Sequence, residues 1–334
     1  MTLLAIEGFD HLTTAQLVDK GWGNFLATVG DYGRFGTKGI MMGTSSSYLS
    51  RNFNLSSKST LYYGFALKKV DAYAPSYQAA DPLVSFNDES QVSQVKFYVN
   101  AANGIQVRQG DGTILGTTAD GVIKEGKYHF IEVKITVSAT VGVVEIKIDE
   151  TQVLNLTSQD TKNGSDYLSH IIFKSIYNQI DVWIDDIYIY DADFLGNCHV
   201  KTFYPDADGN SSDFTRSTGS NDYECVDETP SNEDTDYISS DTLNHKSIFG
   251  ITTGSLPTVK GIQLNNHCKL DEAGARKITP IIRSNSTDYQ GTESNALVED
   301  YAFESEIFED DPDDSGVWTQ TKLEAAEFGL EITT

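Results

Sequence analysis

The chain has 334 residues and a net charge of −25, from 24 basic and 49 acidic residues. This length favours two domains, and so acidic a surface repels a phosphate backbone, which excludes nucleic acid as a partner. The three cysteines are odd in number and far apart, so they predict no disulfide framework. The opening MTLLAIEGFDHL lacks the features of a signal peptide, and no stretch approaches the roughly 18 apolar residues of a membrane helix. We therefore expect a soluble protein made in a cytoplasm, without membrane insertion.

The first half of the chain alternates apolar and polar residues with the period of two that is typical of strands. STLYYGFALKK contains Gly64, a residue that marks a bulge or a close backbone approach inside a strand. In VKFYVNAANGIQVRQ, Asn103-Gly104 predicts a tight hairpin turn. GKYHFIEVKITV and GVVEIKIDETQVLNL continue the alternation, with a turn at Asp149-Glu150-Thr151. Many strands at this spacing predict a β-sandwich.

The order of these segments is similar to that of a concanavalin A-like (laminin-G-like) jelly roll. The resemblance covers about residues 1–193 and rests on GFDHL, GRFGTKGI, LYYGFALKK, LVSFND, EGKYHFIEVKITV, VEIKIDETQVL and WIDDIYIYD. The family's G-x-W-H-x-I-E-V pattern falls on Gly126 to Val133, with Tyr128 where Trp is common. The resemblance implies an N-terminal jelly-roll domain, which we place at residues 1–195.

The strand DVWIDDIYIYD, residues 181–191, carries Asp185 and Asp186 at its centre, where they break the alternation of the two faces. A buried carboxylate needs hydrogen-bond donors around it. In a jelly roll the last strand returns beside the first, here Leu3 to Phe9. We therefore predict that the pair accepts hydrogen bonds from backbone N–H or hydroxyl groups where the two chain ends meet, with a metal site as the alternative.

A boundary near DADFLGNCHV separates a second domain, residues 196–334, whose loops are rich in Asp, Ser and Asn. Strands are predicted at CHVKTFYP, GIQLNNHCKLDEAG, KITPIIRS and YAFESEIF. WTQTKLEAAEFG predicts one short helix, with a capping box formed by Thr321 and Glu324 and an end at Gly329. The predicted fold is thus all-β, with a jelly-roll sandwich followed by a smaller β-sandwich that has one short C-terminal helix.

Three segments of this second domain resemble a module of tailed-bacteriophage virion proteins. Pro205 to Thr215 follows P-x-A-D-G-x-x-S-x-(W/F)-T, Val226 to Tyr237 follows V-D-E-x-P-x-x-(D/E)-D-T-x-Y, and Trp318 to Gly329 follows W-T-x-x-x-(L/V)-x-x-x-x-F-G. The resemblance implies a particle-building protein and supplies no catalytic residues.

Motifs for catalysis are missing from the sequence. The glucanase arrangement Glu-x-Asp-x-x-Glu does not occur, and neither does the Gly-x-Ser-x-Gly turn of Ser hydrolases. His129 lies in an alternating strand, so we interpret it as a partnered interior or cross-strand residue. The sequence therefore predicts no catalytic residue and no enzymatic activity.

Metal ligands are weakly suggested at two places. Asp206, Asp208 and Asn210 have the spacing of the start of a calcium loop, but the glycine stands at the wrong position, so we predict a turn. In Cys198-His199 and His267-Cys268, neighbouring side chains on a strand point to opposite faces, and we interpret these thiols as buried packing groups. We expect no metal and no cofactor.

These patterns predict a structural component of a tailed-phage virion, located in the tail or its fibres and assembled with copies of itself and other virion proteins. One alternative is an adhesin that binds host surface glycans through an exposed aromatic platform flanked by Asp or Asn. The candidate platforms are Trp22, Tyr73 and Tyr77, with Asp71 and Asp81 nearby. A further alternative is a capsid decoration protein.

Overall fold

The computed structural model describes residues 2–43, 47–55, 57–70, 81–175, 181–271 and 275–333. The chain divides into two compact units, unit 1 (residues 1–200) and unit 2 (residues 201–334). Nearly all regular elements of the described residues are strands, so the predicted all-β class is confirmed. Across the described ranges, no helix has the length and apolar character to cross a membrane.

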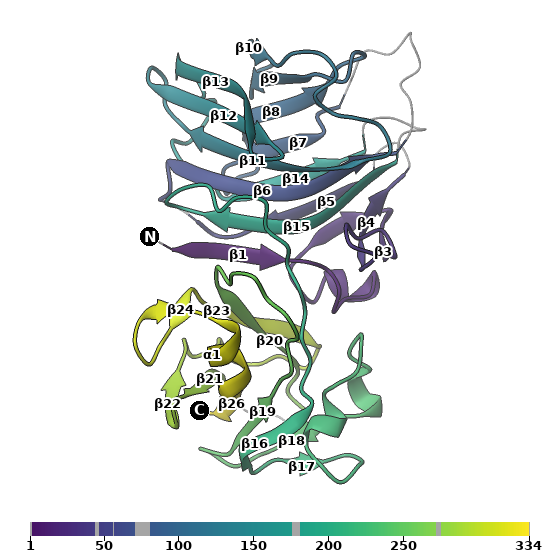
Figure 1. Ribbon diagram of the computed structural model, residues 1–334, viewed down its shortest axis with the longest axis vertical. Helices are drawn as coiled ribbons and strands as arrows, with labels where there is room; N and C mark the ends of the chain where they lie inside the picture. Colours follow the sequence, from purple (N-terminus) through teal and green to yellow (C-terminus); the bar gives the residue numbers. More distant parts are fainter. Residues whose placement is uncertain are drawn as a thin grey trace. The chain divides into compact units, whose positions relative to one another are not determined.

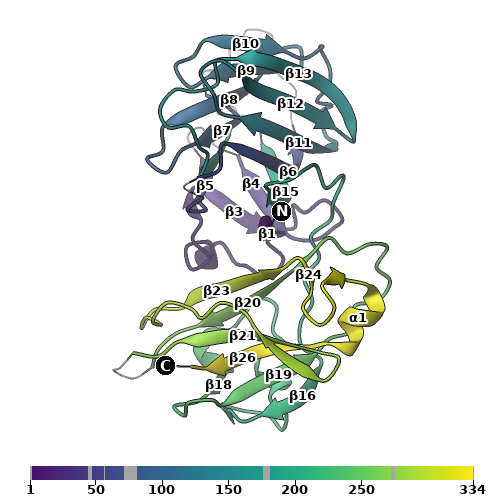
Figure 2. The ribbon, with the colours of Figure 1, turned by 90° about the vertical axis from the view of Figure 1, so that its left-hand side faces the viewer.

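Unit 1 is a sandwich of two antiparallel sheets that face each other (Figure 1, Figure 2). The strands of the eight-stranded sheet are β1 (Leu3–Glu7), β3 (Ala27–Gly30), β4 (Gly39–Met42), β6 (Thr60–Lys69), β11 (Tyr128–Thr136), β12 (Gly142–Ile148), β13 (Thr151–Gln159) and β15 (Val182–Tyr190). They run in the order β13-β12-β11-β6-β15-β4-β3, with β1 also paired to β15.

The seven-stranded sheet forms the other layer. Its strands are β2 (Gly23–Phe25), β5 (Tyr48–Asn52), β7 (Val84–Asn87), β8 (Ser93–Val99), β9 (Ile105–Gln109), β10 (Ile114–Thr117) and β14 (His170–Lys174). They run in the order β10-β9-β8-β7-β14-β5-β2. A short 3-10 helix, η1 (Ala15–Leu17), follows β1. This two-layer arrangement is the jelly-roll sandwich that the sequence predicts.

The core of unit 1 lies between the two sheets and is rich in aromatic rings. Phe65 of β6 meets Phe173 of β14 edge to face, with ring centroids 5.1 Å apart. The predicted turns are present, because Asn103 has a φ of 60° between β8 and β9, and Asp149 has a φ of 48° between β12 and β13. Burial of such apolar surface is the main favourable term for the sandwich.

The Asp pair of β15 lies at a register shift between β15 and β6. The Asp185 carboxylate accepts hydrogen bonds from the backbone N–H of Arg34 at 2.9 Å and of Asp186 at 2.8 Å. Asp186 accepts from the backbone N–H of Val200 at 2.8 Å and from the Arg34 guanidinium at 3.3 Å. Burial raises the pKa of both carboxyl groups. The prediction of backbone donors is confirmed, but these donors belong to β15 itself, to the loop after β3 and to the end of unit 1. Among the described residues none comes from β1, the strand beside which they were predicted.

Gly64 of β6 is a position of close approach, as its sequence context predicts. It pairs with Tyr188 of β15, and a Cβ at Gly64 would lie 2.0 Å from Cε1 of that ring. The ring is fixed in place because its hydroxyl donates to Glu132 at 2.5 Å and accepts from the backbone N–H of Leu195 at 3.1 Å. The glycine therefore provides room for a ring that holds the segment after β15 against the eight-stranded sheet.

Unit 2 is built on a smaller, five-stranded antiparallel sheet in the order β16-β19-β26-β21-β22. Its strands are β16 (Ala207–Ser212), β19 (Lys246–Gly250), β21 (Ile278–Ser284), β22 (Thr287–Gln290) and β26 (Glu327–Ile332). Three two-stranded sheets accompany it within the described residues: β17 (Thr215–Arg216) with β18 (Ile238–Ser239), β20 (Ile262–Cys268) with β23 (Ala302–Phe308), and β24 (Asp310–Asp311) with β25 (Gly316–Val317). The short helices are η2 (Tyr223–Cys225), η3 (Glu233–Thr235) and α1 (Gln320–Ala325).

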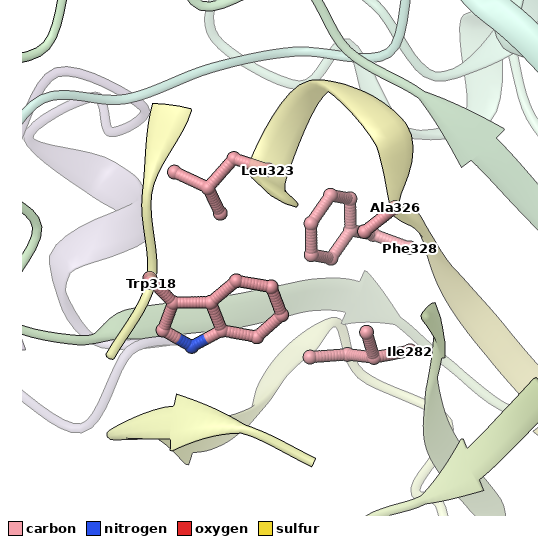
Figure 3. Packing of buried hydrophobic residues seen from close by; sticks show 5 residues of the cluster. All are labelled: Ile282, Trp318, Leu323, Ala326 and Phe328. Atoms are coloured by element: carbon pink, nitrogen blue, oxygen red, sulfur yellow. The ribbon is translucent and has the colours of Figure 1, made fainter. Parts of the chain in front are cut away.

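One hydrophobic cluster of unit 2 gathers around Trp318, which is 1% exposed. Figure 3 shows its indole beside Leu323 of α1, with Phe328 and Ile282 from the five-stranded sheet completing the cluster. The indole N–H donates to the backbone carbonyl of Phe308 at 3.1 Å, so this buried polar group is satisfied. The cluster joins α1 to the sheet.

The single predicted α-helix is confirmed, but its ends differ from the prediction. The N-cap is Thr319, whose hydroxyl accepts from the backbone N–H of Lys322 at 3.2 Å, rather than Thr321. The helix ends at Ala325, and Gly329 lies inside β26, where a Cβ would be 2.0 Å from the carbonyl oxygen of Ser247. Glycine is needed there for close packing of two strands rather than for ending the helix.

Two other local predictions in this region are wrong. Residues 198–205, CHVKTFYP, form no strand. At the predicted turn of residues 206–210, residues 207–210 are instead the start of β16, which pairs with β19. The thiols of Cys198 and Cys268, which were predicted to be buried, are only half-buried, whereas Cys225 is buried.

Candidate functional site

The outward side of the seven-stranded sheet gathers polar side chains from four strands. Inward positions such as Phe97 and Phe173 are buried in the core, so their neighbours along each strand point outward. We call this surface the polar face, and the residues that define it are Asn87 of β7, Lys96 and Tyr98 of β8, Arg108 of β9, and His170 and Lys174 of β14.

The strand register places these residues in neighbouring rows. Arg108 lies opposite Lys96, and Lys96 lies opposite Ser85 of β7. Asn87 lies opposite His170 in the next row. Residues that face each other directly across antiparallel strands have Cβ atoms about 5 Å apart, so side chains from distant parts of the sequence share one surface. A single ligand could span these rows.

The cations of the polar face form no close ion pair with a carboxylate in the part of the chain that the structure describes. The Arg108 guanidinium lies over the Tyr98 ring, 4.2 Å from its centroid, and its Nε donates to Gln106 at 2.7 Å. The Lys96 ammonium donates to the backbone carbonyl of Gly110 at 2.6 Å. Within the described residues, neither of these side chains nor Lys174 forms an ion pair.

Acidic groups lie at the border of this surface. Asp111 interacts electrostatically with Lys96, and Asp81 does so with Tyr98. Asp111 follows β9 in the turn to β10, and Asp81 is exposed ahead of β7. Burial raises the pKa of the Tyr98 hydroxyl, so this group is neutral and can donate a hydrogen bond at neutral pH.

Among the described residues, two buried polar atoms of the polar face lack hydrogen-bond partners. They are Nδ1 of His170 and Oδ1 of Asn87, on side chains that are 4% and 1% exposed. Burial lowers the pKa of His170, so its imidazole is neutral at pH 7. A buried polar atom without a partner costs about 1–3 kcal/mol, and atoms of this kind mark places where a ligand or water can supply the missing bond.

A second cluster of ionisable groups surrounds Glu7 and is enclosed in unit 1. The Glu7 carboxylate is 2% exposed and accepts from the indole N–H of Trp22 at 3.1 Å, with the Arg51 guanidinium at 3.7 Å. Burial alone would raise the pKa of Glu7, but the charges of Lys20, His11 and Arg51 and the Trp22 hydrogen bond hold it below its usual value. Burial also lowers the pKa of Lys20 to about 7. The charges of this network compensate one another, so we assign it a structural role.

A groove of about 560 Å³ opens at one end of the sandwich. Its lining residues are Ser57, Ser59, Val137, Ser138, Ala139, Thr140, Lys162, Asp166 and Tyr167. None of its polar lining side chains is both fully buried and without a partner. The polar face is therefore the better candidate for a prepared binding site.

The glycan-binding residues predicted from the sequence differ in their exposure, and some of them lie outside the described residues. Trp22 is 1% exposed and is bonded to Glu7, so its prediction as an exposed platform is wrong. Tyr73, Tyr77 and Asp71 lie outside the described residues. Asp81 is exposed and borders the polar face.

The prediction for His129 is confirmed. Its Nδ1 lies 2.7 Å from the Asp149 carboxylate, and its Nε2 accepts from the backbone N–H of Lys124 at 2.9 Å. Sequence reasoning missed Tyr98, Arg108 and His170. The available signal was the polar residue at every second position of VKFYV and IQVRQ, which indicates one polar side for each strand; in HIIFK the apolar Ile172 interrupts this pattern.

No family model matches the chain, and no curated protein matches it. Among solved structures, a sialidase aligns with a TM-score of 0.40 and 12% identity over 57% of this chain, which spans 18% of the sialidase. The catalytic domain of a glycoside hydrolase family 131 protein from Coprinopsis cinerea gives a TM-score of 0.41 and 12% identity, covering 60% of this chain and 98% of that domain. A carbohydrate esterase from the Shiga toxin-encoding bacteriophage phi24B aligns with a TM-score of 0.39 and 17% identity. The alignment covers 56% of this chain and 97% of the esterase. Likeness at this level concerns the sandwich fold and carries no information on substrate.

These comparisons correct the prediction that the chain is not an enzyme. The similar structures are named as a sialidase, a glycoside hydrolase and an esterase, so the sandwich is shared with enzymes. Missing glucanase and Ser-hydrolase motifs exclude only those two arrangements. Turnover of carbohydrate is therefore an outcome to be measured beside binding.

Proposed function

We propose that unit 1 binds a carbohydrate on the polar face. The observation that carries this proposal is the pair of unpartnered buried atoms, Nδ1 of His170 and Oδ1 of Asn87, which lie on facing residues of two strands. Sugar hydroxyl groups both donate and accept hydrogen bonds, so one ligand can satisfy both atoms. Strands hold these groups more rigidly than loops do, which lowers the entropic cost of binding.

A glycan array probed with the full chain tests this proposal. We expect specific binding that His170→Ala weakens by about tenfold, the factor for one lost hydrogen bond of ordinary strength. The matched control is Gln152→Ala, an exposed residue of β13 in the other sheet, which should bind like the wild type. Chromatography of the bound oligosaccharide, before and after incubation, shows whether it is also cleaved.

The array has two results that would contradict the proposal. Binding to no glycan by a chain with a native circular dichroism spectrum would remove it altogether. Binding that responds equally to His170→Ala and Gln152→Ala would place the ligand away from the polar face.

A second candidate function is assembly into a tailed-phage particle. Aromatic residues of two of the three virion-like segments support it, because they are buried in hydrophobic clusters of unit 2. Phe214 packs with Ile278 and Ile332, while Trp318 and Phe328 belong to the cluster in Figure 3. Such a module would join copies of the chain or other virion proteins, and the carbohydrate-binding unit would then be carried on the virion.

Purified particles from a lysate that expresses the chain test this second candidate. We expect the chain to remain with the particles through a density gradient, and a labelled antibody to place it on the tail or its fibres in electron micrographs. A label on the head would identify a decoration protein instead. A chain that is found only in the particle-free fraction would rule out a virion component.

A further inference from the structure

The polar face has a charge opposite to that of the chain as a whole. The chain carries a net charge of −25, yet Lys96, Arg108 and Lys174 share one side of a single sheet. Some other cations of unit 1 are paired with carboxylates, as in Lys58 with Asp191 and Lys69 with Glu125. A bound anion would reduce the repulsion among these clustered cations.

In the register of β8 and β9, Arg108 and Lys96 are direct cross-strand partners. Like charges in this position repel each other and destabilise the strand pair. Their hydrogen bonds to Gln106 and Gly110 hold the side chains in place without neutralising either charge. The arrangement keeps two cations side by side.

The remaining donors of Arg108 fit a planar anion. Its Nε is used by Gln106, which leaves the two terminal nitrogens as a fork above the Tyr98 ring. Such a fork matches the two oxygens of a carboxylate in bidentate geometry. The neutral His170 imidazole and the Asn87 amide add groups that bind hydroxyls rather than charge.

We propose that the polar face binds an acidic saccharide, with the carboxylate of a uronic or similar sugar acid bound by Arg108 and Lys96. This inference rests on the proposed carbohydrate-binding function and specifies the ligand. The acidity of the remaining surface does not prevent binding, because charges more than about 8 Å away are screened at physiological salt. At the border, Asp111 offsets part of the Lys96 charge, so Arg108 supplies the main positive charge for a bound carboxylate.

Titration of the full chain with three polysaccharides of matched length tests the inference. They are a polyuronate, the same polymer with its carboxyl groups reduced to alcohols, and a sulfated neutral polymer. We expect the polyuronate to bind, the reduced polymer to bind at least about tenfold more weakly, and added salt to weaken the polyuronate. The sulfated polymer distinguishes a site for sugar carboxylates from general attraction to polyanions, since a tetrahedral oxyanion can also accept two bonds from a guanidinium fork. A sulfated polymer that binds as tightly as the polyuronate would show general attraction to polyanions and overturn the sugar acid.

Arg108→Gln and Lys96→Gln should each lower the polyuronate affinity by about tenfold, whereas Lys127→Gln should change it less than about twofold. Lys127 is exposed in unit 1 and its substitution makes the same change in charge. Arg108→Lys keeps the charge and loses the fork, so it should lie between wild type and Arg108→Gln. Two substitutions at different strands keep the test valid if one of them disturbs folding.

The outcomes separate this inference from the proposed function. Equal affinity for the polyuronate and its reduced form would overturn the acidic ligand and leave carbohydrate binding intact. If the chain binds none of the polymers and no glycan on the array, both the acidic ligand and the carbohydrate-binding function are overturned. A polyuronate affinity that responds to Lys127→Gln as strongly as to Arg108→Gln would place the anion elsewhere.

Discussion

Glu7→Gln is expected to lower the free energy of unfolding of unit 1 by about 3–5 kcal/mol, the usual cost of leaving a buried ion without its partner. Glu7 and Lys20 are each 2% exposed, and the Lys20 charge is the largest favourable influence on the Glu7 carboxylate. Arg51 and the Trp22 indole also lose their acceptor. Denaturant unfolding followed by circular dichroism, with hydrogen exchange of unit 1 amides, measures the change.

The matched control for this prediction is Glu89→Gln, which makes the same chemical change at an exposed residue of the turn between β7 and β8. It should alter the free energy of unfolding by less than about 0.5 kcal/mol. The double variant Glu7→Gln with Lys20→Met removes both charges and should recover part of the loss. If Glu7→Gln unfolds at the same denaturant concentration as Glu89→Gln, the buried network does not stabilise the sandwich.

The same network gives unit 1 an acid-sensitive stability. The pKa of Glu7 is lower in the folded protein than its ordinary value of 4.5, so the folded state binds fewer protons there than the unfolded state. Its contribution is complete above pH 4.5 and is lost as the pH falls through the folded pKa. The Lys20 pKa of about 7 lies below its ordinary 10.5, so its own contribution grows as the pH rises between these values. The acid-side loss should be absent from Glu7→Gln.

Sequence reasoning predicted the elements whose signals are local. The alternation of Val144, Ile146 and Ile148 gave a strand, because one side of each strand must be buried and neighbouring residues face opposite ways. Asn103-Gly104 and Asp149-Glu150 gave turns, because these residues tolerate the positive φ that tight hairpins need. Such patterns need no knowledge of which strands become neighbours.

Features that depend on distant pairing were not predicted. The polar face combines residues from β7, β8, β9 and β14, and only the register of the seven-stranded sheet brings them together. The sequence alone does not show that Trp22 is buried, because its burial depends on a hydrogen bond to Glu7, which lies on β1. For this reason the sequence predicts Trp22 wrongly as an exposed platform. Residues 206–210 have a turn-like composition, yet pairing with β19 makes them the start of an edge strand.

Trp318→Ala is expected to lower the free energy of unfolding of unit 2 by about 3–5 kcal/mol, since a large cavity would remain where the indole lies. The side chain is 1% exposed, and its ring centroid is 6.4 Å from that of Phe328 in β26. Because the indole also bonds the Phe308 carbonyl, the substitution leaves a buried acceptor without its donor.

The neighbouring residue provides the control for Trp318→Ala. Val317 is 68% exposed, so Val317→Ala should change the free energy of unfolding by less than about 0.5 kcal/mol. Circular dichroism and hydrogen exchange should show the loss in α1, β21 and β26, whose residues meet at the indole, with no change in the unit 1 sheets. If Trp318→Ala and Val317→Ala have the same free energy of unfolding, α1 is held to the five-stranded sheet without the indole. A loss that extended equally to β6 and β14 would mean that the two units unfold as one cooperative body.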